Sequence, residues 1–153
     1  MHLTESVDID APPQRVFDVT IDVERWAEWT PSIERIELND GHLAIGATAT
    51  IKQPGVSAAI WRVIEYVPGE RFEWETRAPG VRMVGVHLVE PLDDGRRTHA
   101  LLAVETAGPL APLFTPFLKS MSQRFLRWEA RGLKYRCEDP RYLWRQHEEE
   151  AKA

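Results

Sequence analysis

The chain has 153 residues, of which 43% are hydrophobic and 28% charged, the proportions of an ordinary globular domain rather than of a disordered segment. Its formal net charge of −5 argues against a nucleic-acid-binding surface, because phosphate backbones are bound by clustered lysine and arginine. The single cysteine, Cys137, cannot form an internal disulfide, and no apolar run approaches the roughly 20 residues that would span a bilayer. We therefore expect one cytoplasmic domain without a secretory signal or stable membrane insertion.

The N-terminal segment predicts one strand followed by two short helices. Residues Leu3–Asp10 alternate apolar and acidic side chains, which is typical of a strand with one buried face. A helix is expected over 13–21, because its first residue is a proline and its apolar residues recur at helical spacing. A second, shorter helix is expected over 22–26, with an aspartate as its N-cap, and Pro31 cannot continue it.

The middle of the chain predicts six further strands, separated by short turns that contain glycine, asparagine or aspartate. Short turns join antiparallel neighbours, so we expect an antiparallel meander. The strand over 71–77 has the clearest pattern, because its aromatic residues face one way and its charged residues the other. The six predicted strands span 33–38, 47–52, 58–67, 71–77, 81–90 and 97–106.

A long amphipathic helix is predicted after Gly108-Pro109, where the apolar period changes from 2 to 3.6. Thr115-Pro116 is its candidate cap, after a preceding turn from Leu110, and Asp139-Pro140 ends it. At about 1.5 Å per residue, a helix of about 22 residues is over ~30 Å long, enough to cross a sheet. Its apolar stripe contains Phe114, Phe117, Leu118, Met121, Phe125 and Trp128.

This order of elements predicts an α+β fold, in which a curved, seven-stranded antiparallel sheet wraps around the long C-terminal helix. A straight helix cannot fill a strongly curved sheet uniformly, so the arrangement predicts an internal cavity. The two short helices are expected to close one end of it. Trp26 and Trp29 are expected there, where an indole either packs in the core or lines the cavity.

Three segments make the chain resemble the helix-grip superfamily, which includes START lipid-transfer domains, pollen-allergen-like plant proteins and bacterial polyketide cyclase/dehydrase-like (SRPBCC) proteins. They are VDIDAPPQRVFDVTIDVERWAEWTP, AIWRVIEYVPGERFEWE, and VEPLDDGRRTHALLAVETAGPLAPL running into WEARGLKYRCE. The resemblance covers about residues 3–138, and implies one ligand-binding domain over 1–138 followed by a C-terminal extension over 139–153. Members bind lipids, hormones, quinones or polyketides, and only some are enzymes. The resemblance therefore implies a class of ligand rather than a reaction.

The sequence contains none of the common catalytic motifs, and its five histidines are scattered singly, so we expect neither a metal nor another cofactor. Three polar residues on predicted strands are catalytic candidates, namely Arg62, His87 and Glu105. The alternation favours Val84 and Val86 pointing inward and His87 outward, whereas a bulge would turn His87 into the cavity. The same register decides the orientation of Glu105. Arg62 either binds a carboxylate or enolate inside, or lies in a surface ion pair.

The residues expected to contact a ligand are large apolar side chains on the predicted cavity walls, and each has the alternative of being plain core. Trp74 is preferred to Trp61, because it shares its face with an aromatic neighbour on the same strand. The set comprises Trp26, Trp29, Phe72, Trp74, Val84, Val86, Leu102, Phe117, Met121 and Phe125.

The C-terminal extension carries three adjacent apolar residues beyond the long helix, Tyr142, Leu143 and Trp144. They are expected either to fold back over the sheet or to form an interface, for which a homodimer is the simplest case.

Three functions fit these patterns. The preferred one is binding of a small hydrophobic molecule, such as a lipid, quinone or polyketide. The alternatives are a polyketide cyclase or dehydratase that uses a few polar cavity residues, and a protein-interaction or regulatory module. A polar cluster inside the cavity would favour the enzyme, an apolar cavity would favour binding, and a filled cavity would favour the interaction module.

Overall fold

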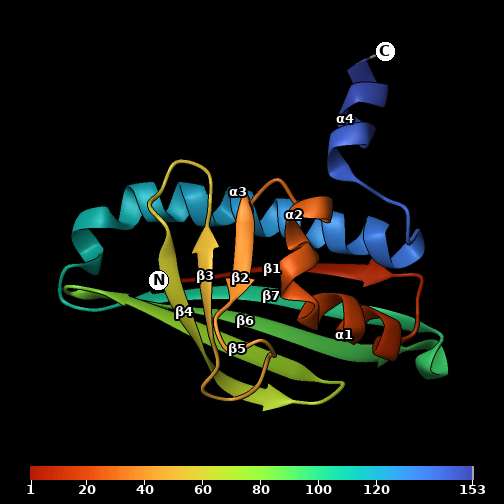
Figure 1. Ribbon diagram of the computed structural model, residues 1–153, viewed down its shortest axis with the longest axis horizontal. Helices are drawn as coiled ribbons and strands as arrows, with labels where there is room; N and C mark the ends of the chain where they lie inside the picture. The colour runs from red at the N-terminus through yellow and green to blue at the C-terminus, as the bar shows by residue number, and fades with distance from the viewer. Residues whose placement is uncertain (153) are drawn as a thin grey trace.

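A computed structural model describes residues 1–152 of the chain (Figure 1). One antiparallel sheet contains all the strands of this region, in the order β1-β7-β6-β5-β4-β3-β2. The strands are β1 (His2–Ile9), β2 (Arg35–Leu38), β3 (Thr48–Lys52), β4 (Ala59–Val67), β5 (Arg71–Ala78), β6 (Val81–Leu92) and β7 (Arg97–Ala107). The sheet curves around α3, as the sequence predicted, and each predicted strand boundary lies within two residues of the observed one.

The helices follow the predicted order with two corrections. They are α1 (Pro13–Ile21), α2 (Trp26–Trp29), α3 (Ala111–Glu138) and α4 (Trp144–Lys152), with 3₁₀ turns η1 (Val23–Arg25) and η2 (Asp93–Gly95). The second helix was predicted over 22–26, but α2 starts where that prediction ended. The predicted cap at Thr115-Pro116 is also wrong, because α3 already begins at Ala111 and encloses Pro116. The side chain of Thr115 donates instead to the Ala111 carbonyl, at 3.0 Å. None of the described helices combines the length and hydrophobicity that crossing a bilayer requires.

The orientation of β6 differs from the favoured sequence interpretation. Phe72 and Trp74 of β5 pair directly with His87 and Gly85 of β6, so these four positions share the inner face of the sheet. Val84 and Val86 therefore point to the outer face, where they form a small cluster with Ala103 and Leu101. Glu73 and Glu75 pair with these two valines, and their side chains are only 14% and 15% exposed. Both faces of β6 are thus buried. The alternation of apolar residues therefore could not identify the inner face, and it pointed to the outer one.

The main core lies between the inner face of the sheet and the short helices together with the C-terminal half of α3. Gly132 allows α2 to pack directly on α3. A Cβ atom at this position would lie 2.0 Å from the carbonyl oxygen of Trp29. No side chain fits at that distance, so glycine sets the separation of the two helices.

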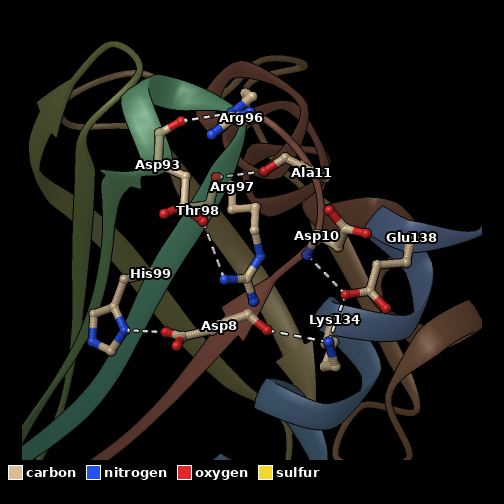
Figure 2. Close-up of polar contacts among 10 residues, drawn as sticks. All are labelled: Asp8, Asp10, Ala11, Asp93, Arg96, Arg97, Thr98, His99, Lys134 and Glu138. Carbon is tan, nitrogen blue, oxygen red and sulfur yellow. Dashed lines mark hydrogen bonds and ion pairs between the residues drawn. The ribbon is translucent and has the colours of Figure 1, made fainter.

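A polar clamp, formed by Asp8, Asp10, Lys134 and Glu138, fixes the C-terminal end of α3 to the edge of the sheet (Figure 2). Lys134 donates to the Asp8 carbonyl oxygen at 3.2 Å and also pairs with Glu138. The Glu138 carboxylate accepts the backbone N–H of Asp10 at 2.8 Å. His99 of β7 extends the network, because its Nδ1 lies 2.7 Å from the Asp8 carboxylate. This hydrogen bond lowers the pKa of Asp8.

The C-terminal extension packs on α2 and α3 of its own chain. The Trp144 indole donates to the carbonyl of Ala27 at 2.9 Å. The ring of Tyr142 lies 5.2 Å from that of Tyr135 in α3, and Arg136 donates to the Tyr142 carbonyl. The expectation that these aromatics fold back over the sheet is therefore wrong, because the helices offer them both apolar contacts and free carbonyls. The rest of α4 projects away from the body of the molecule (Figure 1). The homodimer stays a prediction.

Candidate ligand-binding pocket

A pocket of about 60 Å³ lies between the inner face of the sheet and the middle of α3. Trp26 of α2 lies at its wall, in line with the prediction that the short helices close one end. Most of the lining is apolar, and besides Trp26 its large side chains include Trp61, Trp74, Leu102, Met121, Phe125 and Leu126.

Six of the ten residues predicted to contact a ligand border this pocket, namely Trp26, Trp74, Val86, Leu102, Met121 and Phe125, although the side chain of Val86 points to the outer face. Trp29 and Phe72 are buried in the core beside it, and Val84 belongs to the cluster on the outer face. Phe117 is 59% exposed and lies outside the pocket. The structure thus places the predicted positions inside, behind and outside the pocket, and their contact with a ligand stays a prediction.

An aromatic cluster holds the inner wall in place. The Trp26 ring lies 5.5 Å from Trp74 and 5.2 Å from His87, and its indole N–H donates to the carbonyl of Thr20. Gly85 makes room for Trp74, since a Cβ there would lie 3.0 Å from the indole nitrogen. This aromatic wall of the pocket is therefore held in place by the side chains packed behind it, as expected for a preorganised binding surface.

His87 is buried, with 5% of its surface exposed, and borders the pocket. Its ring stacks on Phe72 with centroids 4.2 Å apart, and Nδ1 lies 3.3 Å from the Phe72 carbonyl oxygen. We assign the proton to Nδ1, because this carbonyl can only accept a hydrogen bond. Burial disfavours the charged ring and lowers the pKa of His87 to about 4. His87 is thus a neutral polar group at neutral pH.

We expect the His87 ring to stay neutral at pH values where an ordinary histidine is already charged. Its NMR ring resonances should remain those of the neutral form until the pH approaches about 4, instead of changing near the usual value of 6.5. The variant His87→Gln identifies the resonances. A midpoint near 6.5 would contradict the burial of this ring.

Glu129 is the ionisable pocket residue that the sequence analysis missed. It lies on α3, and its Oε1 accepts a hydrogen bond from Ser32 Oγ at 3.1 Å. Ser32 Oγ in turn lies 2.8 Å from Thr30 Oγ1, so three polar side chains form a chain beside an apolar wall. Burial raises the pKa of Glu129 to about 7. The sequence did carry a signal, because Glu129 follows Met121 by eight residues and Phe125 by four and so falls on the buried stripe.

Arg62 and Glu105 lie outside the pocket. Arg62 is exposed and donates to the carbonyl of Gly46 at 2.8 Å. It shares the outer face of β4 with Ile60, while Trp61 and Val63 point inward, so the inward orientation considered for it is wrong. Glu105 is also exposed and pairs with His2 at 3.3 Å. Within residues 1–152, moreover, His, Cys, Asp and Glu side chains do not gather in groups of three that could hold a metal ion.

A shallower groove of about 500 Å³ continues from the pocket along the ends of β4, β5 and β6. Met83 borders both spaces, and the rest of the groove lining includes small residues such as Ala59, Ala78 and Ser57 together with Ile60 and Arg77. The pocket can therefore widen toward the groove if the flexible Met83 side chain changes its rotamer.

A family model described as "Polyketide cyclase / dehydrase and lipid transport" matches residues 1–138. The chain belongs to this family. The match to this polyketide cyclase / dehydrase and lipid transport family ends at residue 138, so it does not include the extension over 139–153. The chain is also 25% identical over 130 residues to the uncharacterized protein Rv2574 of Mycobacterium tuberculosis, a match that covers 80% of this chain and 78% of that protein.

Two solved structures show the same fold as this family member. A START superfamily protein from Mycobacterium smegmatis matches with a TM-score of 0.69 and 17% identity, over 90% of this chain and 97% of that chain. The di-domain ARO/CYC BexL from the BE-7585A biosynthetic pathway matches with a TM-score of 0.71 and 19% identity, over 90% of this chain and 46% of that chain. At these identities the likeness concerns the fold alone. The fold and family confirm the predicted helix-grip architecture.

Proposed function

We propose that the protein binds a small hydrophobic molecule, of the lipid, quinone or polyketide kind, in the pocket between the sheet and α3. The main support is that this pocket is lined chiefly by apolar side chains and contains one carboxyl group, that of Glu129, on its wall. Apolar walls with a few oriented polar groups are typical of sites for small organic molecules. A hydroxyl or carbonyl group of the ligand would lie against Glu129 or His87, and its apolar part against Trp74 and Met121.

The size of the pocket requires its wall to move when a ligand binds. A volume of about 60 Å³ is well below the roughly 300–1,000 Å³ of typical ligand pockets. Met83 and Met121 are the natural moving parts, because methionine changes rotamer easily and remains apolar in each one. Their movement would join the pocket to the adjoining groove.

Two experiments test this proposal. Native mass spectrometry of the purified protein, followed by organic extraction, should show a reproducible apolar molecule at about one per chain. Calorimetric titration with the quinone menadione should then show saturable binding. We expect Met121→Trp, which fills the pocket, to weaken this binding at least tenfold, about 1.4 kcal/mol.

The matched control is Phe117→Trp, which places the same side chain one turn earlier on α3 at a position that is 59% exposed. It should change the affinity for menadione by less than about twofold. An empty protein whose weak menadione binding is unchanged by Met121→Trp would contradict a ligand in this pocket.

The second candidate function is a polyketide cyclase or dehydratase. It is favoured by one observation, namely that Glu129, with a pKa of about 7, and neutral His87 border the same pocket. A carboxyl group with a pKa near the working pH can both donate and accept a proton, which an aldol cyclisation or a dehydration requires. In this case a poly-β-ketone thioester would be converted by the wild-type protein and not by Glu129→Gln. If the protein bound the thioester tightly but did not convert it, the binding function would be supported and the enzymatic one contradicted.

A further inference from the structure

The first turns of α3 present apolar side chains to the outside. Leu110, Leu113, Phe114 and Phe117, which we call the α3 apolar face, are 41%, 74%, 49% and 59% exposed. Full burial would stabilise each of them, and the structure buries none of them. Neighbouring exposed side chains of this size usually mark a contact with another molecule.

The charged residues that follow this face along α3, as far as Arg127, all have one sign. Lys119, Arg124 and Arg127 are exposed on α3, and residues 106–128 include no aspartate or glutamate. The next acid along the helix, Glu129, borders the pocket. Because the whole chain has a net charge of −5, this basic segment is a local exception that general composition does not explain.

Helical geometry places apolar and basic residues on one side of α3. At about 100° per residue, Leu113, Phe117, Arg124 and Arg131 fall within about 40° of one direction. The Arg124 guanidinium lies over the rings of Phe125 and Trp128, at 5.7 and 5.5 Å from their centroids. The same side of the helix is therefore apolar at its beginning and basic further along.

The α3 apolar face lies at the end of the molecule opposite the polar clamp and α4 (Figure 1). The backbone N–H of Leu110 donates to the Gly80 carbonyl at 2.9 Å, so the turn between β5 and β6 is its neighbour. Arg77 of β5, whose side chain is 71% exposed, and the groove beside Met83 lie near the same turn. The exposed apolar surface thus adjoins the entrance to the pocket.

We propose that this end of the protein docks peripherally on an anionic lipid bilayer. The α3 apolar face would enter the interface between headgroups and acyl chains, and Arg124 and Arg127, further along the same side of α3, would pair with lipid phosphates. A lipid surface fits better than a protein partner, because an interfacial helix requires exposed Phe and Leu bordered by Lys and Arg. The proposal does not depend on what the pocket binds.

Vesicle co-sedimentation of the full chain tests this docking. The protein should bind vesicles that contain roughly 30% phosphatidylglycerol, bind pure phosphatidylcholine at least tenfold more weakly, and lose binding as the salt concentration rises. The double variant Leu113→Ser/Phe117→Ser should reduce binding at least tenfold while the circular dichroism spectrum and menadione titration stay as in the wild type. The matched control is Ile45→Ser, which removes an apolar side chain that is 68% exposed in the loop before β3 and should leave binding unchanged.

Two results would overturn the proposal. One is equal binding, or none, to the two kinds of vesicle. The other is a wild-type dimer that Leu113→Ser/Phe117→Ser converts to a monomer without any vesicle binding, because the face would then be covered by a second copy of the chain. Loss of menadione binding by Met121→Trp with intact vesicle binding would separate this docking from the ligand site.

Discussion

Replacing Gly132 with valine should lower the free energy of unfolding by about 3 kcal/mol or more. The new Cβ would fall 2.0 Å from the Trp29 carbonyl oxygen, which belongs to the backbone and cannot rotate away. The helices α2 and α3 must then separate, and Trp26, at the other end of α2, loses its position beside the pocket. Urea unfolding followed by circular dichroism measures the loss.

The neighbouring substitution Arg131→Val is the control for this experiment. Arg131 is exposed on the same turn of α3, so valine there should cost only the difference in helix propensity, about 0.5 kcal/mol. If Gly132→Val were no more destabilising than Arg131→Val, the close packing of α2 on α3 would be wrong.

Glu129→Gln should stabilise the protein at about pH 8 by on the order of 2–3 kcal/mol and have little effect at about pH 5. The pKa of Glu129 is about 7 in the folded chain and near 4.5 in the unfolded chain. Between these values the unfolded chain has lost a proton that the folded chain keeps. Wild-type stability therefore falls as the pH rises from 4.5 through 7, and glutamine, which cannot ionise, removes this contribution.

Chemical unfolding of both proteins across this pH range tests this prediction. The quantity compared is the difference between their free energies of unfolding, in which the contributions of the other titrating groups cancel. The variant Ser32→Ala provides the second comparison, because it deletes the hydrogen bond that favours the ionised carboxylate. It should extend the pH-dependent loss of stability to higher pH, with its onset near pH 4.5 unchanged. A pH-independent difference between wild type and Glu129→Gln would mean that the carboxyl group is solvated rather than buried.

The elements of this fold are predictable because most of them depend on local rules. Alternation over β1 and β5, proline at the start of α1 and glycine-containing turns are each satisfied within a few residues. The start of α3 was less predictable, because Pro116 normally marks a helix beginning, and here the helix tolerates it in its second turn. Where the helix begins depends on how the preceding turn packs on Gly80, and this packing cannot be predicted from the sequence.

The pocket was predictable in outline and not in its chemistry. Trp74 of β5 and Met121 of α3 lie on the expected faces, because the large apolar residues around each of them share one face of the element. His87 was assigned the wrong orientation because β6 is buried on both faces, under acidic side chains on one of them. Glu129 was overlooked because acids on a helix are usually solvated, although its spacing from Phe125 placed it among core residues.

The two ends of α3 are held very unequally. Beyond Gly132 the clamp and the tail fix the helix to the rest of the fold, whereas its first turns are held by the Leu110–Gly80 hydrogen bond and expose one side. We therefore expect any displacement of α3 to grow with distance from the clamp. A guest molecule that forces the structure apart would thus shift the helix most beside Met83 and least beside Glu129. If the protein binds a guest as proposed, we expect its selectivity to concern the polar end of the guest, while the apolar end can vary in length.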